Sequence, residues 1–108
     1  MKCPERIRAE IRLLKEAGRT IGTVSETLIY VSTSIPGKEW LRIEFPLDFP
    51  FQPIQCNLSL ELHYEHGGWL NVFDQAGWGP WMHVENILRI IEAGETRVDD
   101  YRKLFKPK

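Results

Sequence analysis

The segment Phe45-Pro46-Leu47-Asp48-Phe49-Pro50-Phe51-Gln52-Pro53 concentrates three of the chain's seven prolines in one short stretch. Proline has no backbone N–H and fixes φ, so a segment of this kind ends strand pairing. Apolar and polar residues alternate on both sides of it, which predicts strands over residues 40–45 and 54–62. We therefore expect the segment to be a rigid link between two strands.

Two further strands are predicted upstream of this link. Residues 20–24 and 27–34 are rich in β-branched side chains, with a short turn at Ser25-Glu26 between them. Pro36-Gly37 is a strong turn signal before the next strand. Because the four strands follow one another with short connections, we expect an antiparallel meander. In the last strand the residues expected on the apolar face are Ile54, Cys56, Leu58, Leu60 and Leu62.

Helical periodicity brackets the strands. Apolar residues recur at helical spacing over residues 4–17, where Gly18 is placed to end the helix and charged residues, Glu10 included, lie mostly off the apolar stripe. A second helix is predicted over residues 84–91, closed by Gly94, and a last one over 95–105. This order predicts an α+β domain whose helices cover one face of the sheet.

Composition limits the class of protein. The chain has 108 residues, 43% of them hydrophobic, and a net charge of −1, which predicts one domain over 1–108 and no basic field for nucleic acid or an anionic membrane. The start MKCPERIRAE is too polar for a signal peptide, and no apolar run approaches the roughly 20 residues that span a bilayer. Cys3 and Cys56 are interpreted as reduced thiols, so we expect a soluble protein of the cytoplasm, the nucleus or both.

A tryptophan-rich stretch, GGWLNVFDQAGWGPW, covers residues 67–81 and holds three of the four tryptophans. It ends in Trp78-Gly79-Pro80-Trp81, immediately before the second predicted helix. Trp78 and Pro80 together predict a stiff corner whose indole covers the edge of the sheet. We expect the aromatic side chains of Phe49, Trp69 and Phe73 to be packed in the core.

The two motifs FPLDFPFQPI and WGPW, in this order, resemble those of the ubiquitin-conjugating enzyme (UBC) family. That family carries F-P-x-D-Y-P-F-x-P-P between its third and fourth strands and W-S-P-A before its second helix. The resemblance runs from Arg6 to Gly94, with Phe49 in place of the tyrosine and Ile54 in place of the last proline. It implies an N-terminal helix, a four-stranded meander, an irregular flap like an active site, and one or two C-terminal helices. The matching structural positions are Phe45, Pro46, Pro50, Pro53 and Trp78.

The resemblance also implies that the chain is not an enzyme. The family's thioester-forming cysteine lies eight residues before the tryptophan of W-S-P, and here that position is Leu70, which has no nucleophile. The family's His-Pro-Asn triplet is replaced by the run from Leu62 to His66. No catalytic residue and no cofactor are therefore expected. The cluster His63, Glu65 and His66 lacks the three or four ligands that zinc needs, so no metal is expected either.

A UBC-like domain without the cysteine resembles the ubiquitin-conjugating enzyme variants. The implied function is binding of ubiquitin, a ubiquitin-like protein or a component of the conjugation machinery, such as a conjugating enzyme or a RING-type ligase. Carried over by position, the contact residues are Arg6, Phe51, Pro80 and Trp81. Glu5 stands where the family often has a basic residue, and Trp81 replaces a small alanine. The alternative for Phe51 and Trp81 is partial burial under a C-terminal helix.

Two other functions stay open at this point. The first is an RWD-type docking domain, which shares the meander and a proline loop and also lacks the cysteine. The Trp-Gly-Pro corner favours the UBC variant over this alternative. The second is an active conjugating enzyme with a relocated nucleophile, for which Cys56 is the candidate. Cys56 belongs to the apolar face of a predicted strand, where a thiol is little accessible.

Overall fold

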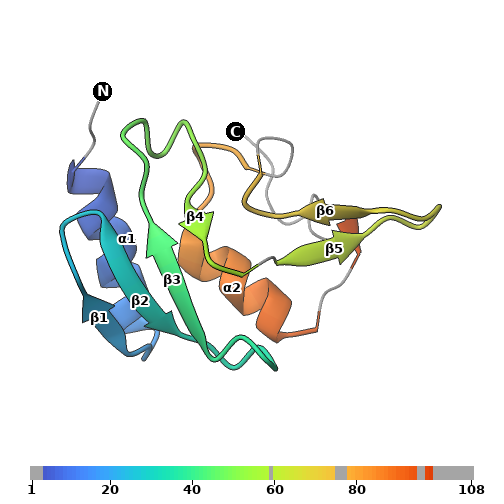
Figure 1. Cartoon of the computed structure of the whole chain (residues 1–108), viewed down its shortest axis with the longest axis horizontal. Coiled ribbons are helices and arrows are strands. Elements are labelled where there is room, and N and C mark those ends of the chain that lie inside the picture. Colours follow the sequence, from blue (N-terminus) through green and yellow to red (C-terminus); the bar gives the residue numbers. More distant parts are fainter. Residues whose placement is uncertain (1–3, 59, 75–77, 95–96, 99–108) are drawn as a thin grey trace.

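The computed structural model describes residues 4–58, 60–74, 78–94, 97 and 98. Along the chain, a helix is followed by the four strands of the main sheet, a two-stranded hairpin and a second helix (Figure 1). The elements are α1 (Pro4–Glu16), β1 (Ile21–Thr23), β2 (Leu28–Ser32), β3 (Trp40–Glu44), β4 (Gln55–Cys56), β5 (Glu61–His63), β6 (Trp69–Asn71) and α2 (Val84–Glu92).

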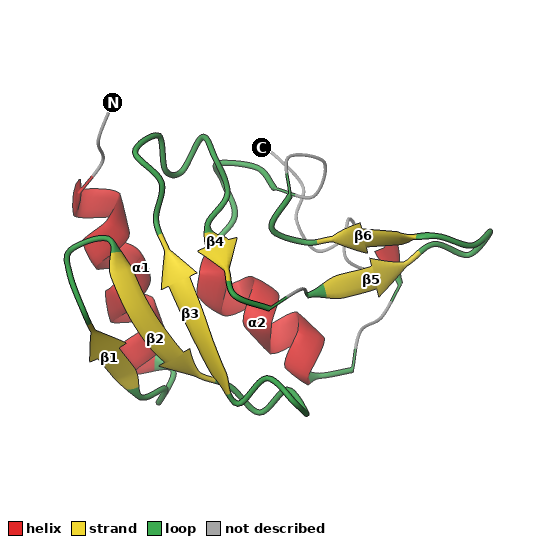
Figure 2. Cartoon of the chain, viewed as in Figure 1, coloured by secondary structure: helices red, strands yellow, loops and turns green. Residues whose placement is uncertain are grey.

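The main sheet has the strand order β1-β2-β3-β4, with every pair antiparallel. The predicted meander is therefore confirmed. Ile29 pairs with Ile43, and Ile43 pairs with Cys56, so these side chains lie on one face. Both helices lie against that face, as Figure 2 shows. The α+β class and the helical cover of one face follow from this arrangement.

The core fills the space between the helices and the sheet. Its fully buried side chains come from both helices, from the strands and from the loops. On β2 and β3 every second residue is buried, and on α1 and α2 the buried residues recur at helical spacing. The largest of them are Leu14, Ile29, Leu41, Ile43, Phe49, Ile54, Leu60, Leu62, Ile87 and Leu88. On β2 and β3 the opposite face leaves Tyr30 and Trp40 exposed.

The prediction of one strand over residues 54–62 was wrong in its continuity. The alternation of burial is present, but the ladder to β3 ends at Cys56, and β5 belongs to a second sheet. The side chain of Asn57 accepts a hydrogen bond from the Arg42 backbone N–H at 2.9 Å, where another strand residue would offer its carbonyl. A side chain that satisfies a backbone donor in this way competes with the ladder.

The flap expected over residues 67–81 is only partly irregular. Within it, Trp69–Asn71 form β6, which pairs with β5 so that Leu62 faces Leu70 and His63 faces Trp69. Because β-strand side chains alternate between faces, Leu70 is buried while Trp69 is 59% exposed. The expected burial of Trp69 was therefore wrong, whereas that of Phe49 and Phe73 is confirmed.

The two main helices lie where the sequence places them. Gly18 follows α1 with a φ of 88°, and Gly94 follows α2 with a φ of 91°, both in the left-handed region that favours glycine. The helix predicted over 95–105 lies almost wholly outside the described residues; of these, Val98 is buried as expected. No helix in the described part of the chain is long and apolar enough to cross a bilayer.

Candidate functional site

The proline segment and the segment of residues 78–82 lie side by side at one end of the molecule (Figure 1). We call residues 78–82 the tryptophan corner. The Trp78 indole N–H donates to the Pro50 carbonyl at 2.6 Å. Its ring lies 5.8 Å from that of Phe49 and 6.0 Å from that of Phe73, centroid to centroid. The Phe49–Pro50 peptide bond is cis. Trp78 thus fastens the two motifs to each other.

Arg6 connects the start of α1 to the same end. Its guanidinium donates to the backbone carbonyls of Pro80 at 2.9 Å and of Met82 at 2.6 Å. The guanidinium carbon also lies 5.6 Å from the centre of the Phe49 ring, within the range of a cation–π contact. The structure therefore places Arg6 mainly as an internal support of the tryptophan corner, with most of its side chain buried.

Glu10 is a buried carboxylate that completes this support. Its Oε1 accepts from the Val84 backbone N–H at 2.8 Å and so caps the first turn of α2 from another helix. Its Oε2 lies 2.5 Å from Nδ1 of His83 and 3.2 Å from Nε of Arg6. At 1% exposure, Glu10 departs from the solvent-facing position that the periodicity of the first helix predicts.

Two aromatic side chains remain exposed around this frame. Phe51 is 67% exposed and Trp81 is 46% exposed. The Trp81 ring packs against the buried Gly79, because a Cβ placed on this glycine would lie 2.4 Å from two carbons of the ring. The structure thus brings the segments that carry Arg6, Phe51, Pro80 and Trp81 to the same end of the molecule, and it leaves the two aromatic rings exposed to solvent.

Leu70, which the resemblance to the UBC family would align with the catalytic cysteine, lies in the β5–β6 hairpin. Leu70 is 5% exposed and faces Leu62 across the β5–β6 pair, so its side chain belongs to the hydrophobic core. The run Leu62–His66, which the resemblance would align with the His-Pro-Asn triplet, covers the end of β5 and the start of the hairpin turn. A side chain at position 70 is thereby directed into apolar surroundings.

Cys56 is half-buried on β4 and lines a cavity of about 270 Å³ together with Asn71 and Phe73. Burial raises the pKa of its thiol to about 12. A thiol with so high a pKa is almost wholly protonated at neutral pH, and the thiolate is the nucleophilic form. Cys3 lies outside the described residues.

The residues at the hairpin turn make local contacts. The rings of Tyr64 and His66 lie 5.3 Å apart, and Glu65 forms an ion pair with Arg97 at 2.8 Å. In the residues that the structure describes, no group of three or more histidine, cysteine or acidic side chains is placed to hold a metal ion.

A second polar cluster, which the sequence does not predict, joins the segment before β1 and the segment after β2 to α2. Arg19 donates to Glu85 at 2.5 Å and forms a two-point contact with Glu92, whose carboxylate also accepts from Ser34. The Arg19 side chain holds the pKa of Glu92 down, at about 2. The charged groups of this cluster are hydrogen-bonded to one another, so we interpret the cluster as a contact that stabilises the fold.

Comparison with protein-family models, with curated proteins and with solved structures gives no match for this chain. The site is therefore defined by its geometry alone: a braced corner that carries two exposed aromatic rings, next to a hairpin whose candidate nucleophile position is a buried hydrocarbon.

Proposed function

We propose that this chain is a non-catalytic protein-binding module with a UBC-like fold. Its partner in this proposal is ubiquitin, a ubiquitin-like protein or a component of the conjugation machinery, such as a conjugating enzyme or a RING-type ligase. The observation that supports it best is the pair Phe51 and Trp81, two large aromatic side chains left exposed on a rigid frame. Aromatic side chains on a preorganised surface are the usual anchors of protein interfaces.

The frame explains why these rings suit binding. The backbone of the tryptophan corner is held by Arg6 and Trp78, and the Trp81 ring rests on Gly79. Little conformational entropy is then lost when a partner covers the rings. In the proposal Phe51 and Trp81 touch the partner, Pro80 shapes the surface between them, and Arg6 holds the corner in place.

The proposed absence of catalysis has separate support. Leu70 fills the hairpin core with hydrocarbon, and burial raises the pKa of the Cys56 thiol to about 12. Neither side chain offers a thiolate for a thioester bond at neutral pH. An RWD-type docking domain would show the same two properties, so the identity of the partner separates the two classes.

The test immobilises the full chain and measures binding of ubiquitin, ubiquitin-like proteins and conjugating enzymes in parallel. Trp81→Ala and Phe51→Ala should each weaken binding, by about 30-fold for an anchor residue. Trp40→Ala removes an equally exposed tryptophan from the far face of the sheet and serves as the matched control. Binding that is lost with Trp40→Ala but kept with the corner variants would refute the proposed surface. If none of these partners binds, the RWD-type alternative replaces the proposal.

A further inference from the structure

A groove separates α1 from the loop between β1 and β2, on a different part of the surface from the tryptophan corner. It has a volume of about 360 Å³ and is lined mainly by apolar atoms. Ile7 and Phe45 are among its buried residues, and Ile11 and Leu47 lie along it. The volume falls within the range of natural ligand clefts.

Leu47 makes this groove unusual as a surface feature. It is 60% exposed, although it directly follows the buried Phe45 and the half-buried Pro46. An exposed leucine next to an apolar hollow is stabilised when a further apolar group covers both, at about 25 cal/mol for each Å² removed from water. The groove therefore favours one bulky apolar side chain as its occupant.

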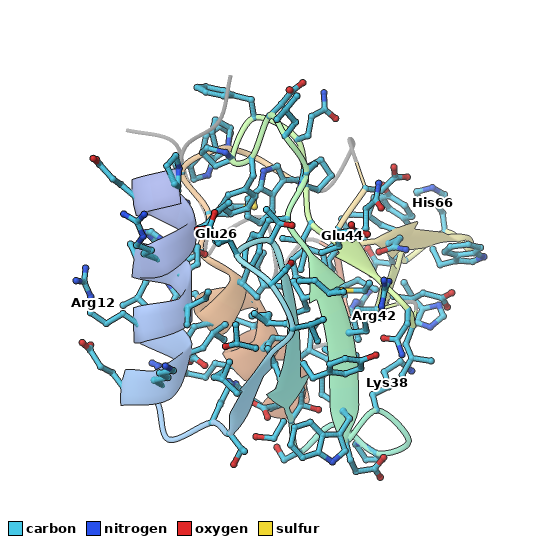
Figure 3. The ribbon with its side chains drawn as sticks, turned by 60° about the vertical axis from the view of Figure 1, so that its left-hand side comes forward. Arg12, Glu26, Lys38, Arg42, Glu44 and His66 are labelled. Carbon is cyan, nitrogen blue, oxygen red and sulfur yellow. The ribbon has the colours of Figure 1, made fainter. Side chains whose placement is uncertain are left out.

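The charges around the groove differ between its two walls. Arg8 lines the groove on its α1 wall, and Arg12 and Lys15 follow it at helical spacing beyond the groove lining, so that the three form an exposed basic stripe along α1. Arg12 approaches Glu16 only to 4.0 Å, and Arg8 and Lys15 form no ion pair with any residue that the structure describes. The opposite wall carries Glu26, which Figure 3 places on the β1–β2 loop beside α1, whereas Arg12 projects into solvent.

We propose that this groove binds a short acidic segment of a partner protein, with one bulky aliphatic or aromatic side chain inserted between α1 and Leu47. Acidic residues of the segment lie along the Arg8–Lys15 stripe. Glu26 repels them from the other wall, and Glu5 and Glu16 limit the stripe at its two ends, so the segment binds in one orientation. The inference is independent of the function proposed for the tryptophan corner, because the two surfaces use different side chains.

The probe is a phage-displayed library of random dodecapeptides, selected on the immobilised full chain. We expect the enriched peptides to combine one bulky apolar residue with several aspartates or glutamates, and we expect their binding to weaken with added salt. If no peptide is enriched, or if the enriched peptides are neutral or basic, the inference is wrong.

Variants of residues in the groove and elsewhere on the surface then locate the binding. Leu47→Ala should weaken the best peptide about 30-fold and Arg8→Glu about tenfold. The Arg8→Glu variant should in turn prefer the same peptide with lysines in place of its acidic residues. Lys38→Glu makes the same charge change on the loop before β3 and should leave binding unchanged.

The corner variants complete the test. Phe51→Ala and Trp81→Ala should not alter peptide binding. Weakening by either of them, together with no effect of Leu47→Ala, would place the peptide at the tryptophan corner and overturn the groove. Conversely, a chain that binds no ubiquitin-pathway protein but retains this peptide behaviour would refute only the proposed function.

Discussion

The Trp81 indole lies directly on Gly79: a Cβ on residue 79 would come within 2.4 Å of two ring carbons and 2.7 Å of a third. The UBC motif has serine and alanine at these two places, so both departures from it occur together in this chain. Gly79 is not in the left-handed region, which means that its backbone tolerates other residues. A glycine is needed at this position because the Trp81 ring leaves no room for a Cβ, and the backbone angle φ does not require it.

This contact predicts a non-additive effect on stability. When Trp81 is present, Gly79→Ala forces its ring to move, so the free energy of unfolding should fall by about 1–3 kcal/mol. In a Trp81→Ala background the same substitution meets no ring and should cost almost nothing. Urea unfolding of the four proteins in this cycle measures the coupling. Equal costs in the two backgrounds would show that the ring does not rest on the glycine.

The contacts of Glu10 predict a large loss of stability when this carboxylate is removed. Glu10→Ala leaves the Val84 N–H without its cap and removes the buried partner of His83 and Arg6. The expected loss in the free energy of unfolding is about 3–5 kcal/mol. Glu10→Gln keeps one oxygen for the cap and should lose about 1–3 kcal/mol. Similar small losses for both variants in urea unfolding would mean that Glu10 does not hold the helices together.

The Arg19–Glu92 contact predicts a specific dependence on pH. The pKa of Glu92 is about 2 in the folded chain against 4.5 for a free glutamate, with its hydrogen bond to Arg19 as the main cause. Its contribution to stability is therefore complete above pH 4.5 and is lost as the pH falls towards 2. The difference in the free energy of unfolding between the wild type and Glu92→Gln should shrink across this interval.

The control for that experiment is Glu16→Gln, which changes an exposed glutamate on α1. Its difference from the wild type should be small. If Glu92→Gln behaves like this control in urea unfolding at several pH values, the ion pair does not contribute to folding.

The chemistry of the hairpin predicts a negative result in a thioester assay. Incubation with ubiquitin-activating enzyme, ATP and ubiquitin should give no adduct that is cleaved by a reducing agent, because the Cys56 thiol stays protonated. Leu70→Cys should not be charged efficiently either, since a side chain at this position faces Leu62 in the core. A reducible adduct that disappears with Cys56→Ser would establish a relocated nucleophile instead.

The sequence predicts the frame of the fold well, and the reason is periodic burial. Both described helices and the order of the meander follow from the spacing of apolar residues. The break after β4 cannot be predicted from the spacing of apolar residues, because it depends on a hydrogen bond from the Arg42 backbone N–H to the Asn57 side chain. The buried ionic contacts were missed for a similar reason: Glu10 meets His83, and Arg19 meets Glu92, only when residues 73 positions apart come together.

The candidate site was predicted as a set of positions but not with these roles. Phe51 is 67% exposed and Trp81 is 46% exposed, and the C-terminal helix of the alternative lies almost wholly outside the described residues, so both interpretations stay predictions. Arg6 instead donates hydrogen bonds to the backbone carbonyls of Pro80 and Met82. No local sequence pattern predicts this contact, because the two carbonyls lie more than 70 residues away along the chain.

The indole N–H signals of the four tryptophans provide the most direct measurement on the proposed binding surface. In ¹⁵N NMR spectra of the full chain, addition of ubiquitin or of a conjugating enzyme should shift the Trp81 signal in a saturable way. The Trp40 signal, from the far face of the sheet, should stay in place. A Trp81 signal that stays unchanged with every such partner, or a shift confined to Trp40, would contradict the proposal that the tryptophan corner binds a protein of the ubiquitin pathway.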